Sequence, residues 1–456
     1  MTLVNVSTGV PTGEGGRLEL YLPLGCLYLV SALERAGIDV EFRDYQLYAR
    51  DLPYQLGIES FQSFLAGSSR ILGISCMVSM LPFVLLGTKR FKESHPDHTI
   101  ILGGPGPSGV AEAIMESMPW IDGVGRGEGE VTLVEVVRAL RCGESLASIP
   151  GITHRDGSGV RRNPRRERIR DLDCLPFPAY DRVDMGSYSN ISIVSGRGCP
   201  YRCAFCDVGP LWDNRTCFRS IENVIAELDL LKNRYGQSRV NVADDTFDLR
   251  RDRAEDFCRE VGGLGIRWTC LARVDLMDDS LLDRMAKAGC DAVFLGIESG
   301  SDAVLAKINK RFTIREATEK AELATRYMKK VITSYIWGFP FETMDDFKST
   351  IFSVVSMWHL GAMAGLKLLS PMPLSRLGIE CRDRLDFHED LCSVFASLGN
   401  IAPSGSSRKT ALPEEFKAII KQHPDIFAGF HYIKHEGIEE KARYLARFNE
   451  KYKIEI

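Results

Sequence analysis

Residues 196–206 read Gly196-Arg197-Gly198-Cys199-Pro200-Tyr201-Arg202-Cys203-Ala204-Phe205-Cys206. They follow an apolar run at 190–196 that is typical of a buried strand. The three cysteines therefore lie on a glycine-flanked loop at the carboxyl end of that strand. Three thiolates spaced within eight residues can surround one metal centre.

Three interpretations of the cysteine loop follow from its ligand chemistry. A closed zinc site needs a fourth ligand, for which Asp207 and Cys217 are the nearest candidates. A 4Fe–4S cluster also takes four ligands, usually all cysteine, so three cysteines would leave one iron open to a non-protein ligand. Three unrelated thiols are the remaining interpretation, and their density argues against it.

The chain around this loop alternates strand and helix patterns six times. The clearest helical pattern is 220–234, with apolar residues on one face and Ser220 as its N-cap. Six such units predict a partial (β/α)6 barrel over residues 189–375, whose chemistry lies at the carboxyl ends of its strands. Strands are expected at 190–196, 239–244, 266–273, 291–297, 331–337 and 364–369.

The first 150 residues predict a second α/β domain. Short apolar strands alternate there with helical stretches such as 25–36, a pattern that predicts a doubly wound, Rossmann-like parallel sheet. Small or polar residues end four of the strands, so this sheet edge is expected to bind a ligand. The strands are expected at 3–8, 38–44, 71–78, 98–104 and 121–125.

Two further regions complete the expected organisation. Residues 151–188 lack helical periodicity and are expected to form a connector containing a hairpin. Residues 376–456 are charged and favour helices, for example at 413–421 and 437–450. They are expected to form a small, mainly helical C-terminal region that covers the substrate as a lid.

Composition restricts the class of protein and its partners. The 456 residues are 45% hydrophobic and 26% charged, which is ordinary for a globular protein. A net charge of −4 and a pI of about 6.1 argue against nonspecific nucleic-acid binding. The uncharged stretch 71–88 is interrupted by Gly and Pro, so a strand followed by a helix is expected there and not a membrane span.

The cysteine count and the N-terminus indicate the cell compartment. The chain has 13 cysteines, an odd number, and its N-terminus shows no signal-peptide pattern. A framework of disulfides is therefore not expected. A reducing, cytoplasmic location is expected instead.

The cysteine motif, C-x-x-x-C-x-x-C with an aromatic residue before the last cysteine, resembles that of the radical S-adenosylmethionine (SAM) enzymes. The resemblance implies that Cys199, Cys203 and Cys206 hold a 4Fe–4S cluster. It implies that the open iron binds SAM through its amino and carboxylate groups. Reduction of the cluster would then release a 5′-deoxyadenosyl radical that abstracts a hydrogen atom.

Later strand ends agree with this resemblance. Asp244 and Asp245 end the second barrel strand, where a carboxylate suits the SAM amine, and Arg273 could form a forked contact with the SAM carboxylate. The loop beginning at Gly338 is where backbone contact with adenine is implied. The residues implied to bind SAM are Phe205, Asp244, Asp245, Arg273, Glu298, Ser299 and Gly338.

The N-terminal half resembles the cobalamin-binding domain that precedes the barrel in one subgroup of these enzymes. The matching stretches include Ile101-Leu102-Gly103-Gly104-Pro105 and Gly125-Arg126-Gly127-Glu128-Gly129-Glu130, and the resemblance as a whole spans residues 3–375. The residues implied to bind cobalamin are Thr8, Ser75, Val78, Ser79, Gly103, Gly104, Pro105, Gly127 and Glu128.

One departure from that domain is informative. The motif Asp-x-His-x-x-Gly, whose histidine ligates cobalt in many cobalamin domains, is missing from this sequence. The only histidines before residue 150 are His95 and His98, which are expected in a solvated turn. The resemblance therefore implies base-off cobalamin without a His ligand, with water or an apolar side chain of the 75–80 loop at its lower face.

The function that these resemblances imply is methyl transfer from methylcobalamin to an unactivated carbon of a biosynthetic intermediate. A radical enzyme that catalyses cyclisation, rearrangement or oxidation without net methylation is the first alternative. An iron–sulfur electron carrier or a zinc-stabilised binding protein is the second. The expected partners are a small-molecule or peptide substrate and an external electron donor such as flavodoxin or ferredoxin.

Overall fold

The computed structural model describes residues 1–8, 10–11, 18–52, 55–157, 159–389 and 413–452. They form two compact units. Unit 1 contains residues 1–170, 174–190 and 413–430, and unit 2 contains 171–173, 191–389 and 431–452. Each unit is built around one mostly or wholly parallel sheet.

The sheet of unit 1 has the strand order β4-β1-β5-β6-β7-β8-β9, and its first five strands are parallel. The chain reverses its direction of travel across the sheet between β1 and β5, because β4 pairs on the other side of β1. Ligands of doubly wound sheets bind beyond the carboxyl ends of the strands at such a point. The bounds are β1 (Thr2–Val6), β4 (Glu41–Asp44), β5 (Ile71–Cys76), β6 (Thr99–Gly103) and β7 (Gly123–Gly125).

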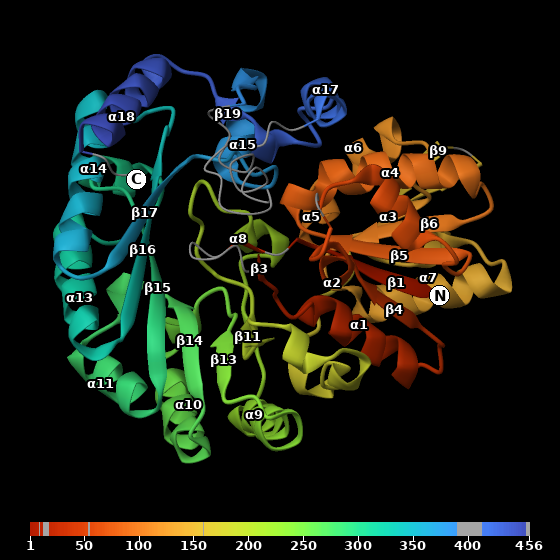
Figure 1. The fold of residues 1–456 in the computed structure, drawn as a ribbon, viewed down its shortest axis with the longest axis horizontal. Coiled ribbons are helices and arrows are strands. Elements are labelled where there is room, and N and C mark those ends of the chain that lie inside the picture. The colour runs from red at the N-terminus through yellow and green to blue at the C-terminus, as the bar shows by residue number, and fades with distance from the viewer. Residues whose placement is uncertain (9, 12–17, 53–54, 158, 390–412, 453–456) are drawn as a thin grey trace. The chain divides into compact units, whose positions relative to one another are not determined.

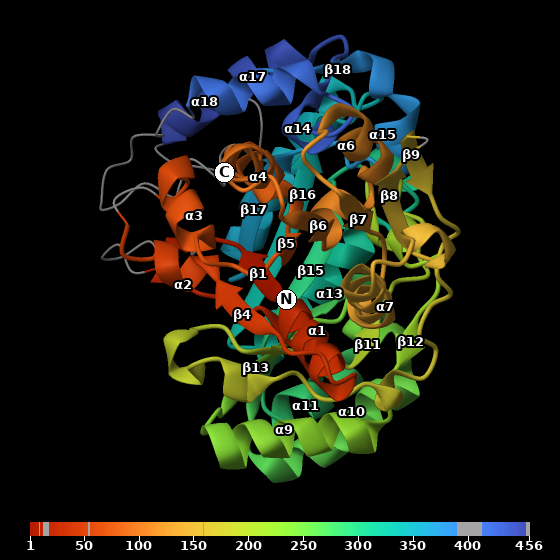
Figure 2. The same ribbon diagram turned by 90° about the vertical axis from the view of Figure 1, so that its right-hand side faces the viewer.

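Helices cover both faces of this sheet (Figure 1). α1 and α7 lie side by side on one face, where Leu3, Val30 and Val137 share one buried cluster (Figure 2). α3 and α4 pack together on the other face. The helices are α1 (Leu24–Arg35), α2 (Tyr45–Ala49), α3 (Ile58–Leu65), α4 (Leu81–Ser94), α5 (Pro105–Ser108), α6 (Ala111–Ser117) and α7 (Gly129–Cys142).

The region expected as a connector belongs largely to unit 1. Its hairpin, β8 (Ile152–Asp156) with β9 (Gly159–Arg162), adds two antiparallel strands to the sheet edge beside β7. Residues 171–173 group with unit 2, and the rest of the connector groups with unit 1. The short pair β2 (Val10–Pro11) and β3 (Leu18–Glu19) completes the strands of unit 1.

Unit 2 is the six-stranded parallel sheet of a partial barrel, in the order β10-β13-β14-β15-β16-β17. All six strands fall where strands were expected, and helices line their outer side (Figure 1). The strands are β10 (Ser192–Ile193), β13 (Arg239–Val242), β14 (Arg267–Ala272), β15 (Cys290–Glu298), β16 (Lys330–Trp337) and β17 (Met363–Leu368). The intervening helices are α9 (Ile221–Tyr235), α10 (Arg251–Leu264), α11 (Asp279–Lys287), α12 (Asp302–Lys307), α13 (Ile314–Tyr327) and α14 (Met344–His359).

Capping residues determine where several of these helices begin. The Ser220 side chain accepts a hydrogen bond from the Asn223 amide at the start of α9, as the sequence predicts. Thr313 and Thr343 form capping boxes with Glu316 and Asp346 at the starts of α13 and α14. These caps fix the points at which the chain leaves the strand-end loops.

The C-terminal region is divided between the two units. α17 (Glu414–Gln422) packs against α4 in unit 1, where Glu415 pairs with Arg90 at 2.7 Å. Unit 2 receives α15 (Arg376–Glu380), the antiparallel pair β18 (Leu385–Asp386) and β19 (Tyr432–Ile433), and α18 (Ile438–Tyr452). Residues 376–456 were expected as one region, of which 390–412 and 453–456 lie outside the described residues.

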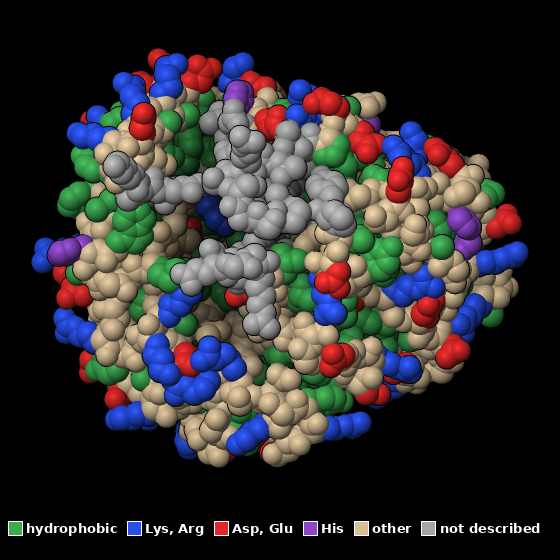
Figure 3. Space-filling model, in the orientation of Figure 1, with side chains coloured by type: hydrophobic (Ala, Val, Ile, Leu, Met, Phe, Trp, Pro, Cys, Tyr) green, Lys and Arg blue, Asp and Glu red, His purple; other side chains and the backbone are tan. Residues whose placement is uncertain are grey.

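The distribution of surface charge and the length of the helices concern two expectations, namely that the protein binds no nucleic acid and has no membrane span. Figure 3 shows acidic and basic side chains interspersed on the face that it presents. Among the described residues, no helix is both long and apolar enough to cross a membrane. The stretch 71–88 forms β5, a short turn and the first half of α4, as expected.

Candidate active site

The cysteine loop of unit 2 is closed by a short ladder. β11 (Gly196–Arg197) pairs antiparallel with β12 (Cys217–Phe218), so the segment with all three motif cysteines projects as a closed loop. A side chain at Gly196 would place a Cβ 2.7 Å from the Phe218 ring, so the ladder requires glycine there. All three cysteines are free thiols of intermediate exposure.

Two neighbouring carboxylates hold the base of this loop. Asp244 is 2% exposed, and it accepts hydrogen bonds from the Ser195 amide at 2.6 Å, the Ser195 hydroxyl at 2.5 Å and the Gly196 amide at 3.0 Å. Asp245 accepts one from the Gly198 amide at 2.9 Å. The Asp244 carboxylate is therefore turned toward the loop backbone, which differs from the implied contact with a SAM amine.

The thiols differ in how readily they ionise. Burial raises the pKa of Cys206 to about 12. Burial also raises the pKa of Cys203, while the nearby cations of Lys310 and Arg273 oppose that shift. Since iron binds thiolates, loading this loop must release protons. The positive charges of Lys310 and Arg273 therefore favour the thiolate form of Cys203, the middle cysteine of the motif.

Arg273 lies beside the cysteine loop. Its guanidinium stacks over the Tyr201 ring with 3.7 Å between Cζ and the ring centroid, and it forms two 3.0 Å hydrogen bonds with Asp275. The side chain is 8% exposed. A guanidinium fixed by stacking and a bidentate partner is a rigid donor for a carboxylate, as the sequence argument requires.

Glu298 and Lys310 form a buried ion pair near the same loop. Their charged atoms are 3.1 Å apart, and Lys310 also donates to the Gly296 carbonyl at 2.9 Å. The pairing register of β15 and β16 shifts between Gly296 and Glu298, and Glu298 has a φ of 75°. A bulge of this kind re-aims a side chain, and backbone strain of this kind gathers at functional sites.

Ser299 follows Glu298 at the end of β15, and Gly338 lies at the end of the next strand, β16. Ser299 is fully buried, with its hydroxyl 3.2 Å from that of Thr350. Gly338 has a φ of 84°, and its amide donates to Glu342 at 2.9 Å. A Cβ at this glycine would lie 2.5 Å from Leu368, so the loop needs glycine for both conformation and space. Phe205 packs edge-on against Phe339 of this loop, with 6.1 Å between ring centroids.

The ligand-permissive edge of unit 1 is held together by close backbone contacts. A Cβ on Gly104, whose φ is 90°, would lie 2.7 Å from the Ser75 hydroxyl and 2.9 Å from the Cys76 carbonyl. Pro105 begins α5 directly after it, and Gly103 ends β6. The loop after β6 thus touches the end of β5, and only small residues allow it.

The other residues expected at this edge lie on the flanking loops. Thr8 follows β1, and its hydroxyl lies 4.0 Å from the Met80 sulfur. Gly127 is exposed with a φ of 76° after β7. Glu128 is turned inward, since its carboxylate accepts from the Ile169 amide at 2.9 Å and its side chain is 5% exposed.

The 75–80 loop presents an apolar side chain. Met77 is 54% exposed, whereas Val78 and Ser79 are half-buried in the short turn that follows. His95 stacks on Phe91, with 4.3 Å between ring centroids, at the end of α4, and His98 precedes β6. Both histidines therefore lie at the amino ends of the strands, opposite the ligand-permissive edge.

Residues that sequence reasoning did not single out complete the barrel site. Lys310, Tyr201, Asp275 and Ser195 all contact residues that it did name. Tyr201 lies inside the cysteine motif and Asp275 lies two residues after Arg273, so spacing could have suggested both. Lys310 lies in an ordinary polar turn, and only the fold brings it to Glu298.

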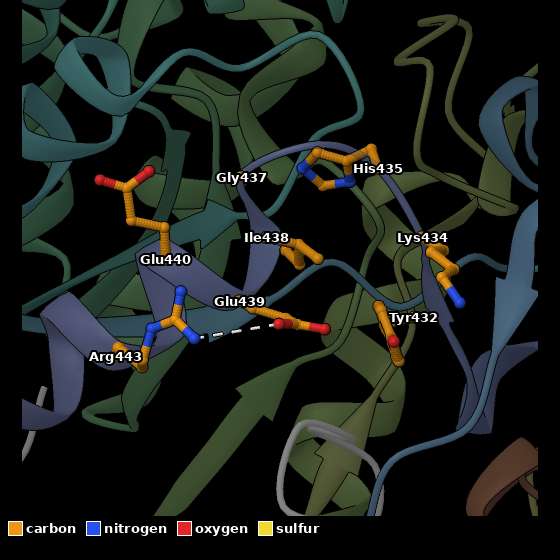
Figure 4. Close-up of a pocket in the computed structure, with 8 residues that line it drawn as sticks. All are labelled: Tyr432, Lys434, His435, Gly437, Ile438, Glu439, Glu440 and Arg443. Carbon is orange, nitrogen blue, oxygen red and sulfur yellow. Dashed lines mark ion pairs between the residues drawn. The ribbon is translucent and has the colours of Figure 1, made fainter.

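A cavity in unit 2 lies apart from the expected cofactor residues. A cavity of about 260 Å³ opens at the start of α18, where Arg443 pairs with Glu439 at 3.9 Å (Figure 4). None of the expected cofactor residues lines it. Within the described ranges, no three His, Cys, Asp or Glu side chains converge as they would around one metal ion. A cluster of four irons is larger than one ion and needs its thiolates further apart.

Known protein families match the sequences of both units. The sequence pattern of the Radical SAM superfamily matches residues 193–354, and that of the B12 binding domain matches residues 18–137. A Pyrococcus horikoshii protein named uncharacterized methyltransferase PH0819 is 33% identical over 336 residues, which is 72% of each chain. The chain belongs to the cobalamin-dependent radical SAM enzymes.

Solved structures of this enzyme family share the fold. The methyltransferase TsrM of Kitasatospora setae superposes with a TM-score of 0.71 at 19% identity, covering 98% of this chain and 87% of that one. The radical enzyme OxsB, solved with aqua-cobalamin and SAM bound, gives a TM-score of 0.68 at 19% identity, covering 98% and 66%.

A second curated relative of this radical SAM enzyme has a different named reaction. The anaerobic magnesium-protoporphyrin IX monomethyl ester cyclase of Rubrivivax gelatinosus is 28% identical over 310 residues, covering 65% of this chain and 55% of that protein.

Family membership determines the cofactors. They are a 4Fe–4S cluster and SAM for the barrel, and cobalamin for the N-terminal domain. The donor set of unit 2 fits the cluster, because one closed loop presents three thiols with cations beside them. The edge of unit 1 fits a large flat ligand, because its loops carry small residues and an exposed methionine.

Proposed function

We propose that this enzyme transfers a methyl group to an unactivated carbon of a small biosynthetic intermediate. The observation that carries the proposal is the 33% identity, over 72% of both chains, to a protein named as a methyltransferase. When bound, the cluster with SAM supplies a hydrogen-abstracting radical and cobalamin supplies the methyl group. The chain supplies the binding, orientation and electrostatics for that chemistry.

In unit 2, the motif and the contacts of its neighbours support a role for each residue. Cys199, Cys203 and Cys206 would hold the cluster. Arg273, fixed by Tyr201 and Asp275, would bind the SAM carboxylate. Asp245 is the better candidate for the SAM amine, because the oxygens of Asp244 are turned toward Ser195 and Gly196.

Other unit 2 residues would shape the rest of the SAM site. The Glu298–Lys310 pair would place charge beside the bound sulfonium, and the backbone at Gly338 would approach adenine. Phe205 would pack beside the cluster, while Ser299, which is fully buried, would hold the loop that follows Glu298.

In unit 1, cobalamin would lie on the glycine loops. The loops of Thr8, Ser75, Gly103, Gly104, Pro105 and Gly127 would let the backbone approach the ring and its tail. Met77, with Val78 and Ser79, would be the part of the 75–80 loop that contacts bound cobalamin, and Met77 would offer it an exposed apolar side chain. Glu128 would act by holding the loop after β7 through Ile169.

The enzyme also needs a source of electrons. We infer an external one-electron donor such as flavodoxin or ferredoxin, since a radical SAM cluster acts only when reduced. The twelve cysteines within the described ranges are free thiols, which suits a reducing compartment such as the cytoplasm.

The proposal is tested by reconstitution without oxygen. The protein is loaded with iron, sulfide and hydroxocobalamin, and bound metals are counted. Reduced enzyme is then incubated with SAM and candidate substrates. We expect one cobalt and about four irons per chain. We expect both 5′-deoxyadenosine and S-adenosylhomocysteine with the true substrate. Protein that binds iron but no cobalt would contradict the methyl-transfer proposal.

A second function is favoured by the similarity to the Rubrivivax cyclase. In that case the same two cofactors would serve a cyclisation or oxidation without net methylation. The products separate the two functions, because the second predicts 5′-deoxyadenosine with no S-adenosylhomocysteine.

A further inference from the structure

The loop after β16 is joined to the C-terminal helix of unit 2 by a buried ion pair. Lys441 of α18 lies 3.1 Å from the Glu342 carboxylate, and the two side chains are 2% and 0% exposed. No other described Lys side chain in an ion pair is as buried as that of Lys441. Its ammonium also donates to the Glu342 backbone carbonyl at 2.5 Å.

The same carboxylate holds the glycine of the loop. Glu342 accepts the Gly338 amide at 2.9 Å through Oε2, the oxygen that faces Lys441. The cation therefore contacts Glu342 twice, at the carboxylate that accepts the Gly338 amide and at the backbone carbonyl. Burial raises the pKa of Glu342, and the charge of Lys441 opposes that rise.

Packing connects the helix to the loop a second time. Gly338 has a φ of 84°, and a Cβ there would lie 3.1 Å from Ile438, the first residue of α18. Nearly two turns further along the helix, Tyr444 lies edge-on against Phe347 of α14, with 6.2 Å between ring centroids. The helix thus covers the loop with an apolar contact on one side and a buried charge on the other.

We propose that Lys441 is a positioning residue for SAM, which acts by holding the Gly338–Glu342 loop in the conformation that binds it. The inference rests on the proposed function, because it takes this loop as part of the SAM site. Removing the ammonium leaves a buried carboxylate without its cation, which must take up a proton or move. Either change weakens the hold on Gly338, because a protonated carboxyl group accepts the amide less strongly than a carboxylate and a displaced one does not accept it.

The test compares variants of the reconstituted full-length enzyme. Lys441→Met keeps the length of the side chain and removes its charge. Arg443→Met is the matched control, because Arg443 lies on the same helix and forms an exposed pair with Glu439. The readouts are the Kd for SAM by equilibrium dialysis and the iron and cobalt content per chain.

We expect Lys441→Met to raise the Kd for SAM at least tenfold, with iron and cobalt contents unchanged. The control should stay within twofold of wild type. The double variant Glu342→Gln/Lys441→Met should recover part of the affinity, because a neutral amide oxygen can still accept the Gly338 amide. Wild-type affinity in Lys441→Met would overturn the inference.

Hydrogen exchange on the wild type tests the inference even if the variants fold poorly. SAM should slow exchange in 338–343 and in the first two turns of α18 together. Protection of the loop without any change in α18 would overturn the inference alone. A wild type that holds iron but binds no SAM would overturn the proposed function as well.

Discussion

The two units prepare their cofactor edges in opposite ways. The barrel edge of unit 2 is built from charged side chains that are buried and already paired, such as Arg273 with Asp275 and Glu298 with Lys310. The edge of unit 1 depends on the absence of side chains. Gly104, which has no Cβ, lets the backbone of Cys76 come within contact distance. One edge recognises charge and the other recognises shape.

This contrast predicts how each edge responds to change. A paired, buried charge is sensitive to the loss of its partner, because the remaining charge is left without compensation. An edge of glycines is sensitive to added volume and tolerant of lost charge. Variants in one unit should therefore affect one cofactor and spare the other.

The largest expected effect comes from the cysteine loop. Cys203→Ala removes one of three thiolates, and two cannot retain the cluster. Bound iron should fall from about four per chain to nearly none, and 5′-deoxyadenosine should disappear. Cobalt per chain, measured on the same sample, should stay at the wild-type value. Loss of cobalt together with iron would contradict the separation of the two edges.

The next effect is on the glycine edge. Gly104→Val adds a branched side chain at a positive φ against Ser75 and Cys76, which costs about 2–5 kcal/mol in strain and overpacking. The Kd for cobalamin should rise by about 30-fold or more. The Kd for SAM and the iron content should not change. Gly25→Ala is the control, because nothing lies within 4 Å of a Cβ there.

A smaller effect is expected at the guanidinium. Arg273→Lys keeps the charge but loses the bidentate contact with Asp275 and most of the stacking on Tyr201. The Kd for SAM, measured by titration calorimetry, should rise by about tenfold. Unchanged affinity would show that a positive charge alone suffices to bind SAM. It would weaken the contrast between the paired charges of unit 2 and the glycines of unit 1.

A fourth effect concerns the pH dependence of folding stability and not the binding of a cofactor. Burial raises the pKa of Asp248, which accepts the Arg273 amide at 2.9 Å, to about 7. Between an unfolded value near 4 and this value, folding takes up a proton at Asp248, so the cost of burying this carboxyl group is smallest at low pH and grows as pH rises toward 7. The contribution is up to about 1.4 kcal/mol per pH unit.

Asp248→Asn removes the proton uptake described for that carboxyl group. Between pH 5 and 7, the thermal midpoint of the cofactor-free variant should therefore fall less, or rise more, with increasing pH than that of the wild type. An equal or more negative slope in the variant would contradict the raised pKa.

Sequence periodicity predicted the strands and the main helices of both units, because apolar alternation and caps act locally. The motif also pointed to Arg273 and Glu298, since strand ends meet at one edge of a parallel sheet. It did not distinguish the orientation of Asp244 from that of Asp245, because the direction of a carboxylate depends on which backbone amides the fold brings near it. Lys310 and Lys441 were missed for the same reason: each is distant in sequence from the carboxylate that it neutralises.

The division of the C-terminal segment has a consequence for protein engineering and for the history of the gene. α17 belongs to unit 1 and α18 belongs to unit 2, although only fifteen residues lie between Gln422 and Ile438. A single cut in the chain cannot release either unit intact, and a stop codon before α17 would damage both together. Exchange of one cofactor module for another would therefore need junctions at more than one point in the chain.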